Sequence, residues 1–529
     1  MLTTPRVRRG MVSSPHHLAS EAGLRVLREG GNAIEAALAA AATLSVVYPH
    51  MTGIGGDGFW LIAVPGRGPT AIDACGGAAV AASVNLYKDR GLRAVPWRGP
   101  LAANTVAGTV GGFDLALRLS CVFGGRLSLQ RLLEDAVWHA ERGYAVTASQ
   151  AQLTAEKLAE LVEQPGFATT FLEAGRCPAE GAVMKLPALG RTLRRLGKSG
   201  CDGFYRGGMA ADIAADLARV GSPVSRKDLA RYRARRVRAL GVQLASARLF
   251  NMPPPTQGLA SLLILALFEQ LGVTEGEGFE HIHGLVEATK QAFLVRDRII
   301  GDPAAMREKP ADYLEPAVVE RLALQIDRRK ALAWPHAAPG GDTVWLGAVD
   351  AQGVAVSFIQ SLYFEFGSGV VLPETGILWQ NRGASFALAG AGPRLLAPGR
   401  KPFHTLNPAM ARLADGRVMV YGTMGGEGQP QTQAAIFSRY AMFGQDLQAA
   451  VTAPRWLLGK TWGEDSVTLK LESRFDPALV DALRAAGHEV DLVAPFSTMM
   501  GHAGALVRHG NGVIEGAADP RSDGAVMGY

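Results

Sequence analysis

Residues 342–369 read DTVWLGAVDAQGVAVSFIQSLYFEFGSG, and this stretch decides the fold. Two apolar, β-prone runs flank the polar turn Asp350–Gly353, a pattern that predicts a β-hairpin. The segment Pro339–Gly341 comes before the first run and is typical of a flexible, exposed breaker. Thr343 is therefore expected to open a buried strand just after a loop that can be cut.

Cleavage between Asp342 and Thr343 would give Thr343 a free α-amine beside its own hydroxyl. An α-amine has an unperturbed pKa of roughly 7.7–8.0, so near neutral pH it can take the hydroxyl proton in place of a histidine base. The alternative is an ordinary strand threonine, and spacing alone favours that alternative because threonine is common in strands. The residues around Thr343 decide between the two.

This region resembles the γ-glutamyltransferase family of self-cleaving amidohydrolases. Members carry a nucleophilic Thr that opens a strand, then Val-Asp-x-x-Gly, Phe-Gly-Ser/Thr-Gly and a Gly-Ile-Leu turn with Asn. The matching residues here are Thr343, Val349–Gly353, Phe366–Gly369, Gly376–Leu378 and Asn381. The likeness extends over nearly the whole chain, with further matches at Ala19–Gly23, Gly30–Ala33, Tyr48–Gly58, Gly108–Gly112, Met252–Gly258 and Asp519–Arg521.

The resemblance implies an α+β fold, the four-layer αββα sandwich of N-terminal-nucleophile hydrolases. It also implies a precursor that cuts itself between Asp342 and Thr343. The large fragment would comprise residues 1–342 and the small fragment residues 343–529, the latter beginning with the nucleophile. Both are expected to interleave in one domain, because the family's two sheets share strands from both. The basic, aperiodic stretch 326–342 would become the free tail of the large fragment.

The resemblance also implies the catalytic residues. Thr343 would be the nucleophile, and Ser361 occupies the position of a family Thr that hydrogen-bonds it. Gly425 and Gly426 match a Gly-Gly turn whose backbone N–H groups form an oxyanion hole. Loss of one such donor typically costs roughly 2.7–4 kcal/mol of transition-state stabilisation. The alternatives are an ordinary strand serine at Ser361 and a simple tight turn at the glycines.

The substrate-binding positions depart from the γ-glutamyl enzymes of the family. Those enzymes hold the substrate α-carboxylate with an Arg in Ile-Asp-x-Arg, and Ile72–Cys75 lacks this Arg. Their acidic partner for the α-amine is replaced by Ser385. Their Ser-Ser pair is replaced by His404 and Thr405, and a strand Asn by Tyr363. The site has lost the anion that would meet a substrate ammonium.

Arg382 adds a cation that can bind a carboxylate bidentately, so it joins Tyr363, His404 and Thr405 as a predicted substrate contact. Because a buried polar mismatch discriminates strongly between substrates, glutathione is disfavoured. The sequence around these residues resembles the oxamate amidohydrolase branch, which hydrolyses oxamate to oxalate and ammonia in purine breakdown. The alternatives are a γ-glutamyltransferase, a glutathione hydrolase or related acylase, and, in another class, an unprocessed relative that binds a ligand without chemistry.

Composition is compatible with this interpretation. The 529 residues are 48% hydrophobic and 19% charged, as in ordinary globular proteins. The net charge of +6 is spread along the chain, including Arg231–Arg238, which favours solvated faces over nucleic-acid binding and suits a small anionic amide substrate. The four cysteines lie far apart, a spacing that fits a reducing compartment. The longest apolar run, Leu259–Phe268, is too short to cross a bilayer, and no secretory signal is evident, so we expect a cytoplasmic protein without a membrane partner.

Two other motifs bear on whether the protein binds a cofactor or a metal. Gly53, Gly55 and Gly58 match the dinucleotide fingerprint, but a helix is expected before them and a strand after them, the reverse of the required order. His281 and His283 could be metal ligands, but the sequence indicates no carboxylate or cysteine partner at metal-ligand spacing. A packed helix is therefore favoured over a metal site. We therefore expect no cofactor and no metal. A homodimer or a heterotetramer of two processed chains is left open.

Overall fold

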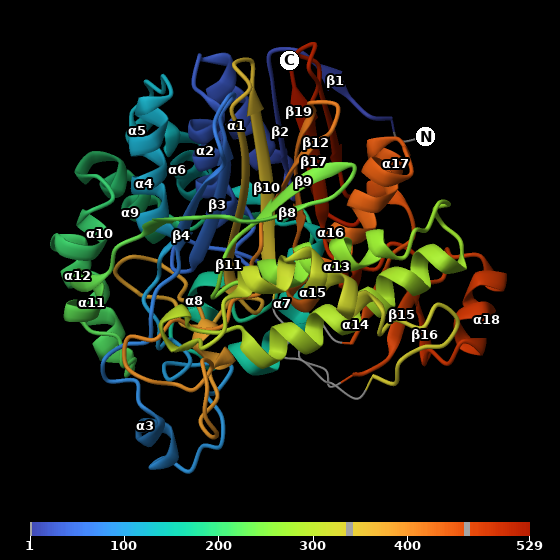
Figure 1. The fold of residues 1–529 in the computed structure, drawn as a ribbon. Coiled ribbons are helices and arrows are strands. Elements are labelled where there is room, and N and C mark those ends of the chain that lie inside the picture. Colours follow the sequence, from blue (N-terminus) through green and yellow to red (C-terminus); the bar gives the residue numbers. More distant parts are fainter. Residues whose placement is uncertain (1–2, 335–341, 460–465) are drawn as a thin grey trace.

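The computed structural model describes residues 3–334, 342–459 and 466–529, and its centre is a pair of seven-stranded antiparallel sheets (Figure 1). The first sheet has the order β1 (Arg6–Val7), β18 (Ile514–Ala518), β17 (Ala503–Arg508), β13 (Val418–Thr423), β12 (Ala409–Leu413), β9 (Ala247–Asn251), β8 (Leu240–Gln243). The second has the order β19 (Ala525–Gly528), β2 (Gly10–Ser14), β10 (Asp342–Asp350), β11 (Ala355–Tyr363), β3 (Asp57–Ala63), β4 (Thr70–Ala74), β7 (Arg235–Val237). Both sheets contain strands from either side of residue 342.

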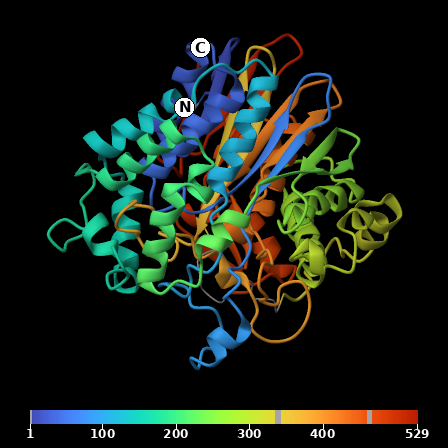
Figure 2. The same cartoon turned by 90° about the vertical axis from the view of Figure 1, so that its left-hand side faces the viewer.

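Helices cover the outer face of each sheet (Figures 1 and 2). On the side of the second sheet lie α1 (His17–Arg28), α2 (Ala33–Val47) and α4 (Thr109–Val122), with α5 (Leu129–Leu132), α6 (Glu134–Arg142) and α9 (Pro187–Ser199) packed outside them. On the first sheet lie α13 (Gly258–Gln270), α14 (Phe279–Ile299), α16 (Gln429–Phe437) and α17 (Leu447–Thr452). The remaining helices are α3 (Val84–Lys88), α7 (Ala148–Leu161), α8 (Phe167–Phe171), α10 (Gly203–Arg206), α11 (Gly208–Val220), α12 (Arg226–Arg231), α15 (Pro316–Ala323) and α18 (Pro477–Ala485). Small sheets pair β5 (Tyr144–Ala145) with β6 (Val183–Met184), and join β14 (Trp456–Leu458), β15 (Leu469–Glu472) and β16 (Val490–Val493).

Three hydrophobic clusters fill the three interfaces between these four layers. One cluster packs helices such as α2 against the second sheet, and another packs α13, α14 and α16 against the first. The third lies between the sheets and includes Phe59, Trp345, Met410 and Leu506. This arrangement confirms the predicted αββα sandwich. Because every sheet face is covered, polar groups inside it need partners or a function.

Helix α2 shows how the sequence specifies a layer. All its residues are buried, and its many alanines permit close packing. Asn32 caps the helix: its side chain accepts from the N–H groups of Ile34 and Glu35, while the Glu35 carboxylate accepts from the Asn32 N–H. Asp350 accepts from the Ala33 N–H at 2.9 Å, which joins the start of α2 to the end of β10.

The predicted hairpin is confirmed as β10 and β11, at the centre of the second sheet. Its pairing slips by one residue near the open end, where Thr343 lies opposite two residues, Ser361 and Leu362. Such a bulge interrupts the ladder and re-aims side chains, and bulges are common beside functional sites. The predicted order at Gly53–Gly58 is also confirmed, because α2 precedes this turn and β3 follows it.

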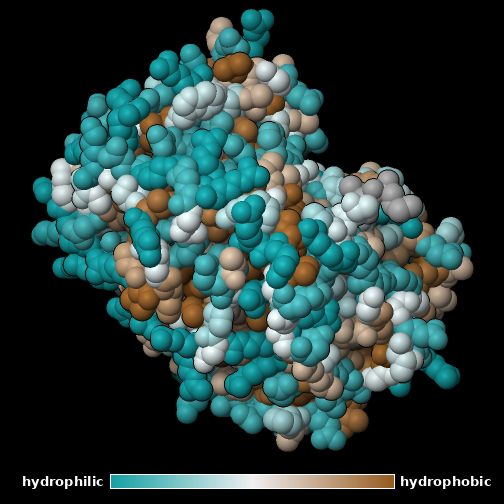
Figure 3. Space-filling model, turned by 90° about the horizontal axis from the view of Figure 1, so that it is seen from above, coloured by the Kyte–Doolittle hydropathy of each residue, from teal (hydrophilic) through white to brown (hydrophobic). Residues whose placement is uncertain are grey.

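The molecular surface seen from above is mainly hydrophilic, and its hydrophobic residues form small, separated groups (Figure 3). This face therefore has no broad apolar area of the kind that marks a protein or membrane interface. Within the described ranges, no helix combines the length and the hydropathy that crossing a membrane requires.

Candidate active site

Thr343 lies at the start of β10 and is fully buried. Its Oγ1 accepts a hydrogen bond from Nε2 of Gln429 at 3.2 Å. Gln429 is the first residue of α16, so this bond joins the second sheet to the helical layer on the first. Of the linker predicted to precede the cut, residues 335–341 lie outside the described residues, while the Asp342–Thr343 peptide begins β10.

Ser361 lies at the bulge opposite Thr343. Its Oγ accepts from the Tyr363 N–H at 2.7 Å. Tyr363 has a φ of 90°, a conformation that is costly for a bulky residue. Strained backbone of this kind persists where the surrounding structure over-determines it, and it clusters at ligand-binding sites.

The predicted oxyanion turn lies between β13 and α16. Gly425 has a φ of 113° and Gly426 a φ of 50°, so both need the freedom of glycine. Gly426 begins a single 3₁₀ turn that ends at Gly428, directly before Gln429. Within a helical turn the first backbone N–H groups, here that of Gly426, form no hydrogen bond inside the turn. Gln429, whose side chain contacts the Thr343 hydroxyl, therefore follows Gly426 by three positions in the chain.

Arg382 is fully buried, and its guanidinium stacks on the Tyr363 ring with Cζ 3.8 Å from the centroid. Nη1 donates to Thr405 Oγ1 at 3.2 Å. Nε and Nη2 have no hydrogen-bond partner among the described residues. Burial lowers the pKa of Arg382 to about 10, so the side chain remains a cation at neutral pH. A buried cation with two free donors in a fork matches the geometry of a carboxylate.

His404 and Asp57 form a second polar pair at the site. His404 Nε2 lies 2.9 Å from Asp57 Oδ2, and the N–H groups of Gly76 and Gly108 donate to Asp57 Oδ1. Burial raises the pKa of Asp57 to about 7. Burial also holds the pKa of His404 well below its usual range, so the ring is neutral. With Nε2 as the donor to Asp57, His404 Nδ1 is left as an acceptor without a partner among the described residues.

Gln257 lies in Met252–Gly258, a segment that matches the family but for which the sequence indicated no role. It links the glycine turn to Thr405. Its Nε2 donates to the carbonyl of Gly426 at 2.8 Å and to that of Thr405 at 2.7 Å. Its Oε1 accepts from Arg296 Nη1 at 2.9 Å, which fixes the orientation of the amide. Arg296 in turn pairs with Glu427, the residue after the glycine turn. These five residues are buried, so each bond is protected from water.

Hydrogen bonds, ring stacking, strand register and chain adjacency together link the predicted site residues. One route runs from Thr343 through Gln429 to the Gly425–Gly426 turn. From there Gln257 leads to Thr405, which is bonded to Arg382. Arg382 stacks on Tyr363, whose N–H is bonded to Ser361 opposite Thr343, and His404 adjoins Thr405 in the chain. The residues that the sequence reasoning missed are Asp57, Gln257 and Gln429. The first two lie in matching segments, which was a usable signal.

Replacing Gln257 with leucine, which is close in size, is expected to lower kcat for amide hydrolysis by about 10–100-fold, with a smaller change in KM. The variant loses both bonds that hold the glycine turn to the Thr405 loop, and a small displacement of oxyanion donors is costly. Steady-state kinetics on fully processed protein, checked by intact mass, measure this. Gln243→Leu, on the exposed edge strand β8, is the matched control. Equal kinetics in the two variants would contradict the positioning role of Gln257.

Two clusters of metal-ligating side chains occur among the described residues, and the expectation about His283 needs correction. Glu287 lies one helical turn after His283, and His488 completes a buried group with them, so a carboxylate partner does exist. However, the Lys290 ammonium lies 2.7 Å from Glu287 Oε1 and already supplies a cation. The donors of this cluster therefore do not favour a metal.

The second cluster consists of Asp57, Cys75 and His404 within the candidate active site. Burial raises the pKa of the Cys75 thiol well above its usual range, so it stays protonated and is a poor ligand. The guanidinium of Arg382 also acts electrostatically on Asp57, where a cation would compete with it. This donor set suits an anionic ligand better than a metal.

Comparison with known proteins gives the same family over nearly the entire chain. The sequence profile of the gamma-glutamyltranspeptidase family matches residues 19–529. The chain is similar to the oxamate amidohydrolase proenzyme of Klebsiella pneumoniae, with 54% identity over 98% of each chain. It is also similar to the glutathione hydrolase-like YwrD proenzyme of Bacillus subtilis, with 39% identity over 98% of each chain.

The fold is shared with solved structures. The cephalosporin acylase from Bacillus halodurans superposes with a TM-score of 0.92 and 31% identity, covering 100% of this chain and 97% of that one. The buried threonine at the start of a central strand, the αββα layers and the family match agree with one another. The chain is an amidohydrolase of the N-terminal-nucleophile type and belongs to the gamma-glutamyltranspeptidase family.

Proposed function

We propose that this protein cuts itself between Asp342 and Thr343 and then hydrolyses a small amide that bears a carboxylate, such as oxamate, to oxalate and ammonia. The observation that carries the proposal is the buried Arg382 cation, whose Nε and Nη2 are free to donate to a carboxylate. The printed name of the Klebsiella pneumoniae relative, oxamate amidohydrolase proenzyme, supports the same substrate class.

The position that holds a substrate ammonium in γ-glutamyl enzymes carries no charge here. Ser385 donates instead to the carbonyls of Arg382 and Phe403, at 3.0 and 3.1 Å. A γ-glutamyl substrate would bring its ammonium toward the Arg382 guanidinium, and a like-charge contact in a buried site costs several kcal/mol. Oxamate has one carboxylate and no amine, so it matches the charge of this site.

The proposed reaction runs through an acyl-threonine. The α-amine of processed Thr343 takes the proton from its Oγ1, and Oγ1 bonds to the amide carbon. The N–H groups of Gly425 and Gly426 stabilise the oxyanion, while Ser361 orients the nucleophile. The proton passes to the amide nitrogen, the C–N bond breaks and ammonia leaves. Water, deprotonated by the same amine, then cleaves the ester and releases oxalate.

Within this mechanism Arg382 and Tyr363 hold the substrate carboxylate, and Thr405 fixes the guanidinium. His404 Nδ1, an acceptor, suits an amide N–H of the substrate. A two-carbon acid amide places its carboxylate next to its reacting carbonyl. Binding of the carboxylate at Arg382 would therefore hold the carbonyl in a fixed orientation toward Thr343. Such positioning lowers the entropic part of the activation barrier.

The decisive experiment compares kcat/KM for oxamate with kcat/KM for γ-glutamyl-p-nitroanilide on processed protein. We expect oxamate to be preferred by about 100-fold or more, because the mismatched ammonium leaves buried charge uncompensated. Faster turnover of γ-glutamyl-p-nitroanilide would overturn the substrate assignment in favour of a glutathione hydrolase or related acylase. Turnover of neither, by an uncut chain, would favour a ligand-binding relative without chemistry.

A further inference from the structure

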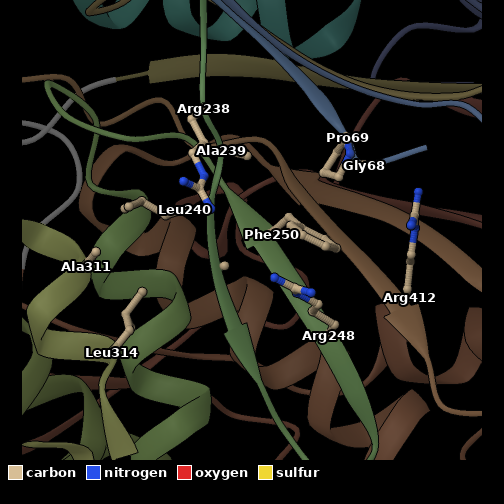
Figure 4. A pocket seen from close by; sticks show the side chains of 11 residues that line it. Gly68, Pro69, Arg238, Ala239, Leu240, Arg248, Phe250, Ala311, Leu314 and Arg412 are labelled. Atoms are coloured by element: carbon tan, nitrogen blue, oxygen red, sulfur yellow. The ribbon is translucent and has the colours of Figure 1, made fainter.

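A cavity of about 600 Å³ lies away from the candidate active site, at one edge of the two sheets (Figure 4). β7 is the last strand of the second sheet and β8 the last strand of the first, and Arg238 lies in the short link between them. Arg248 on β9 and Arg412 on β12 also line the cavity. Basic side chains from β9, from β12 and from the link between β7 and β8 therefore line the same cavity. Arg238, in that link, is the last residue of the basic segment 231–238.

The charge of these arginines is not balanced locally. No Asp or Glu lines the cavity, and no salt bridge from Arg238, Arg248 or Arg412 to a carboxylate occurs in the described part of the chain. Arg412 donates to the backbone carbonyl of Arg67, which orders its side chain without neutralising it. In Figure 4 the Arg238 side chain extends toward the cavity from the link between β7 and β8 and the Arg248 side chain from β9, while Arg412 extends toward Gly68 and Pro69. Three like charges around one concave space favour an anion within it.

The rest of the lining is apolar. The Phe250 ring lies between the arginines in Figure 4, and the Cζ of Arg248 is 5.5 Å from its centroid. Leu240 and Leu314 complete this lining. An aromatic ring beside a guanidinium suits a flat group, while the guanidinium forks of the arginines suit carboxylate or phosphate oxygens.

We propose that this cavity binds a small organic anion in which phosphate or carboxylate groups are attached to a flat, apolar body. The volume is in the range of small-molecule sites, and apolar walls with a few converging charged groups are their usual composition. Residues of the candidate active site do not line it, so it is a second site, independent of the proposed hydrolysis. A nucleoside monophosphate and an aromatic dicarboxylate are two forms of the same ligand chemistry.

The test is isothermal titration of the full-length, processed protein at constant ionic strength. The probes are adenosine monophosphate, benzene-1,3-dicarboxylate, adenosine and inorganic phosphate. We expect saturable binding of one of the first two at one molecule per chain, and weaker binding of adenosine and phosphate. The stronger of the two anions identifies which charged group the site prefers.

Arg238→Gln and Arg248→Gln are each expected to weaken that binding about tenfold, since each removes a charge-assisted hydrogen bond. Both residues are exposed, so folding is expected to be preserved, and the melting temperature checks this. Arg93→Gln, an exposed arginine outside the cavity, is the matched control. Absence of saturable binding by any probe at millimolar concentration would overturn the proposal. Equal weakening in the control would also overturn it, because the attraction would then come from the overall charge.

Discussion

Replacing Thr343 with alanine is expected to leave the chain uncut and to abolish hydrolysis. In the proposed mechanism the Thr343 hydroxyl both breaks the Asp342–Thr343 bond and attacks the substrate. Removal of a catalytic nucleophile typically lowers kcat by about 10⁴–10⁶-fold. Intact mass with N-terminal sequencing would find two fragments in the wild type, the smaller beginning with Thr343, and one chain in the variant. An oxamate assay measures the lost turnover.

Thr343→Ser is the matched control, because it keeps the hydroxyl and removes only a methyl group. It should be cut and retain part of the activity. Two fragments in Thr343→Ala would mean that another group breaks the bond. A single uncut chain in the wild type would contradict the mechanism as a whole, because Thr343 would then have no free amine.

Arg382→Met is expected to reduce kcat/KM for oxamate by about 10²–10³-fold, corresponding to about 3–4 kcal/mol for a lost charge-assisted, bidentate contact. Burial lowers the pKa of Arg382 to about 10, so the wild-type cation is present across the neutral range. Methionine keeps much of the packing on Tyr363 and supplies no donor. Arg382→Lys should recover part of the loss, since it restores the charge without the fork.

Oxamide as a second substrate distinguishes two roles of Arg382, binding of the substrate carboxylate and support of the site's structure. It replaces the carboxylate of oxamate with a neutral amide, so Arg382→Met should reduce its turnover far less. Intact mass should find the variant processed like the wild type. An equal loss for oxamate and oxamide would mean that Arg382 supports the structure of the site and does not bind the carboxylate.

Local patterns in the sequence were enough to predict the central hairpin and the order of helix, turn and strand around Gly53–Gly58. They also indicated the strand position of Thr343, because turns, caps and alternation are properties of neighbouring residues. The resemblance to the family supplied the αββα layers and the residues of the candidate site. The contacts of that site were not predictable in the same way. Gln257 contacts the carbonyls of residues 148 and 169 positions away, and no periodicity carries such information.

The stacking of Arg382 on Tyr363 illustrates the same limit. Both residues were predicted as substrate contacts, but the sequence indicated neither their mutual stacking nor the positive φ at Tyr363. The expectation that His283 has no carboxylate partner failed for a different reason. Glu287 and its i,i+3 partner Lys290 were visible on the same predicted helix as His283, whereas His488 joins them only through the packing of a distant segment.

The distribution of strands over the two sheets has a consequence for the lifetime of the processed protein. Since each sheet contains strands from before and from after residue 342, neither fragment holds a complete sheet. A cut at that position would remove no contact described above, and the pieces would unfold together. Refolding, however, would change from a first-order to a second-order reaction between two chains. Self-cleavage would thus convert a precursor that can refold into an enzyme whose persistence depends on its unfolding rate.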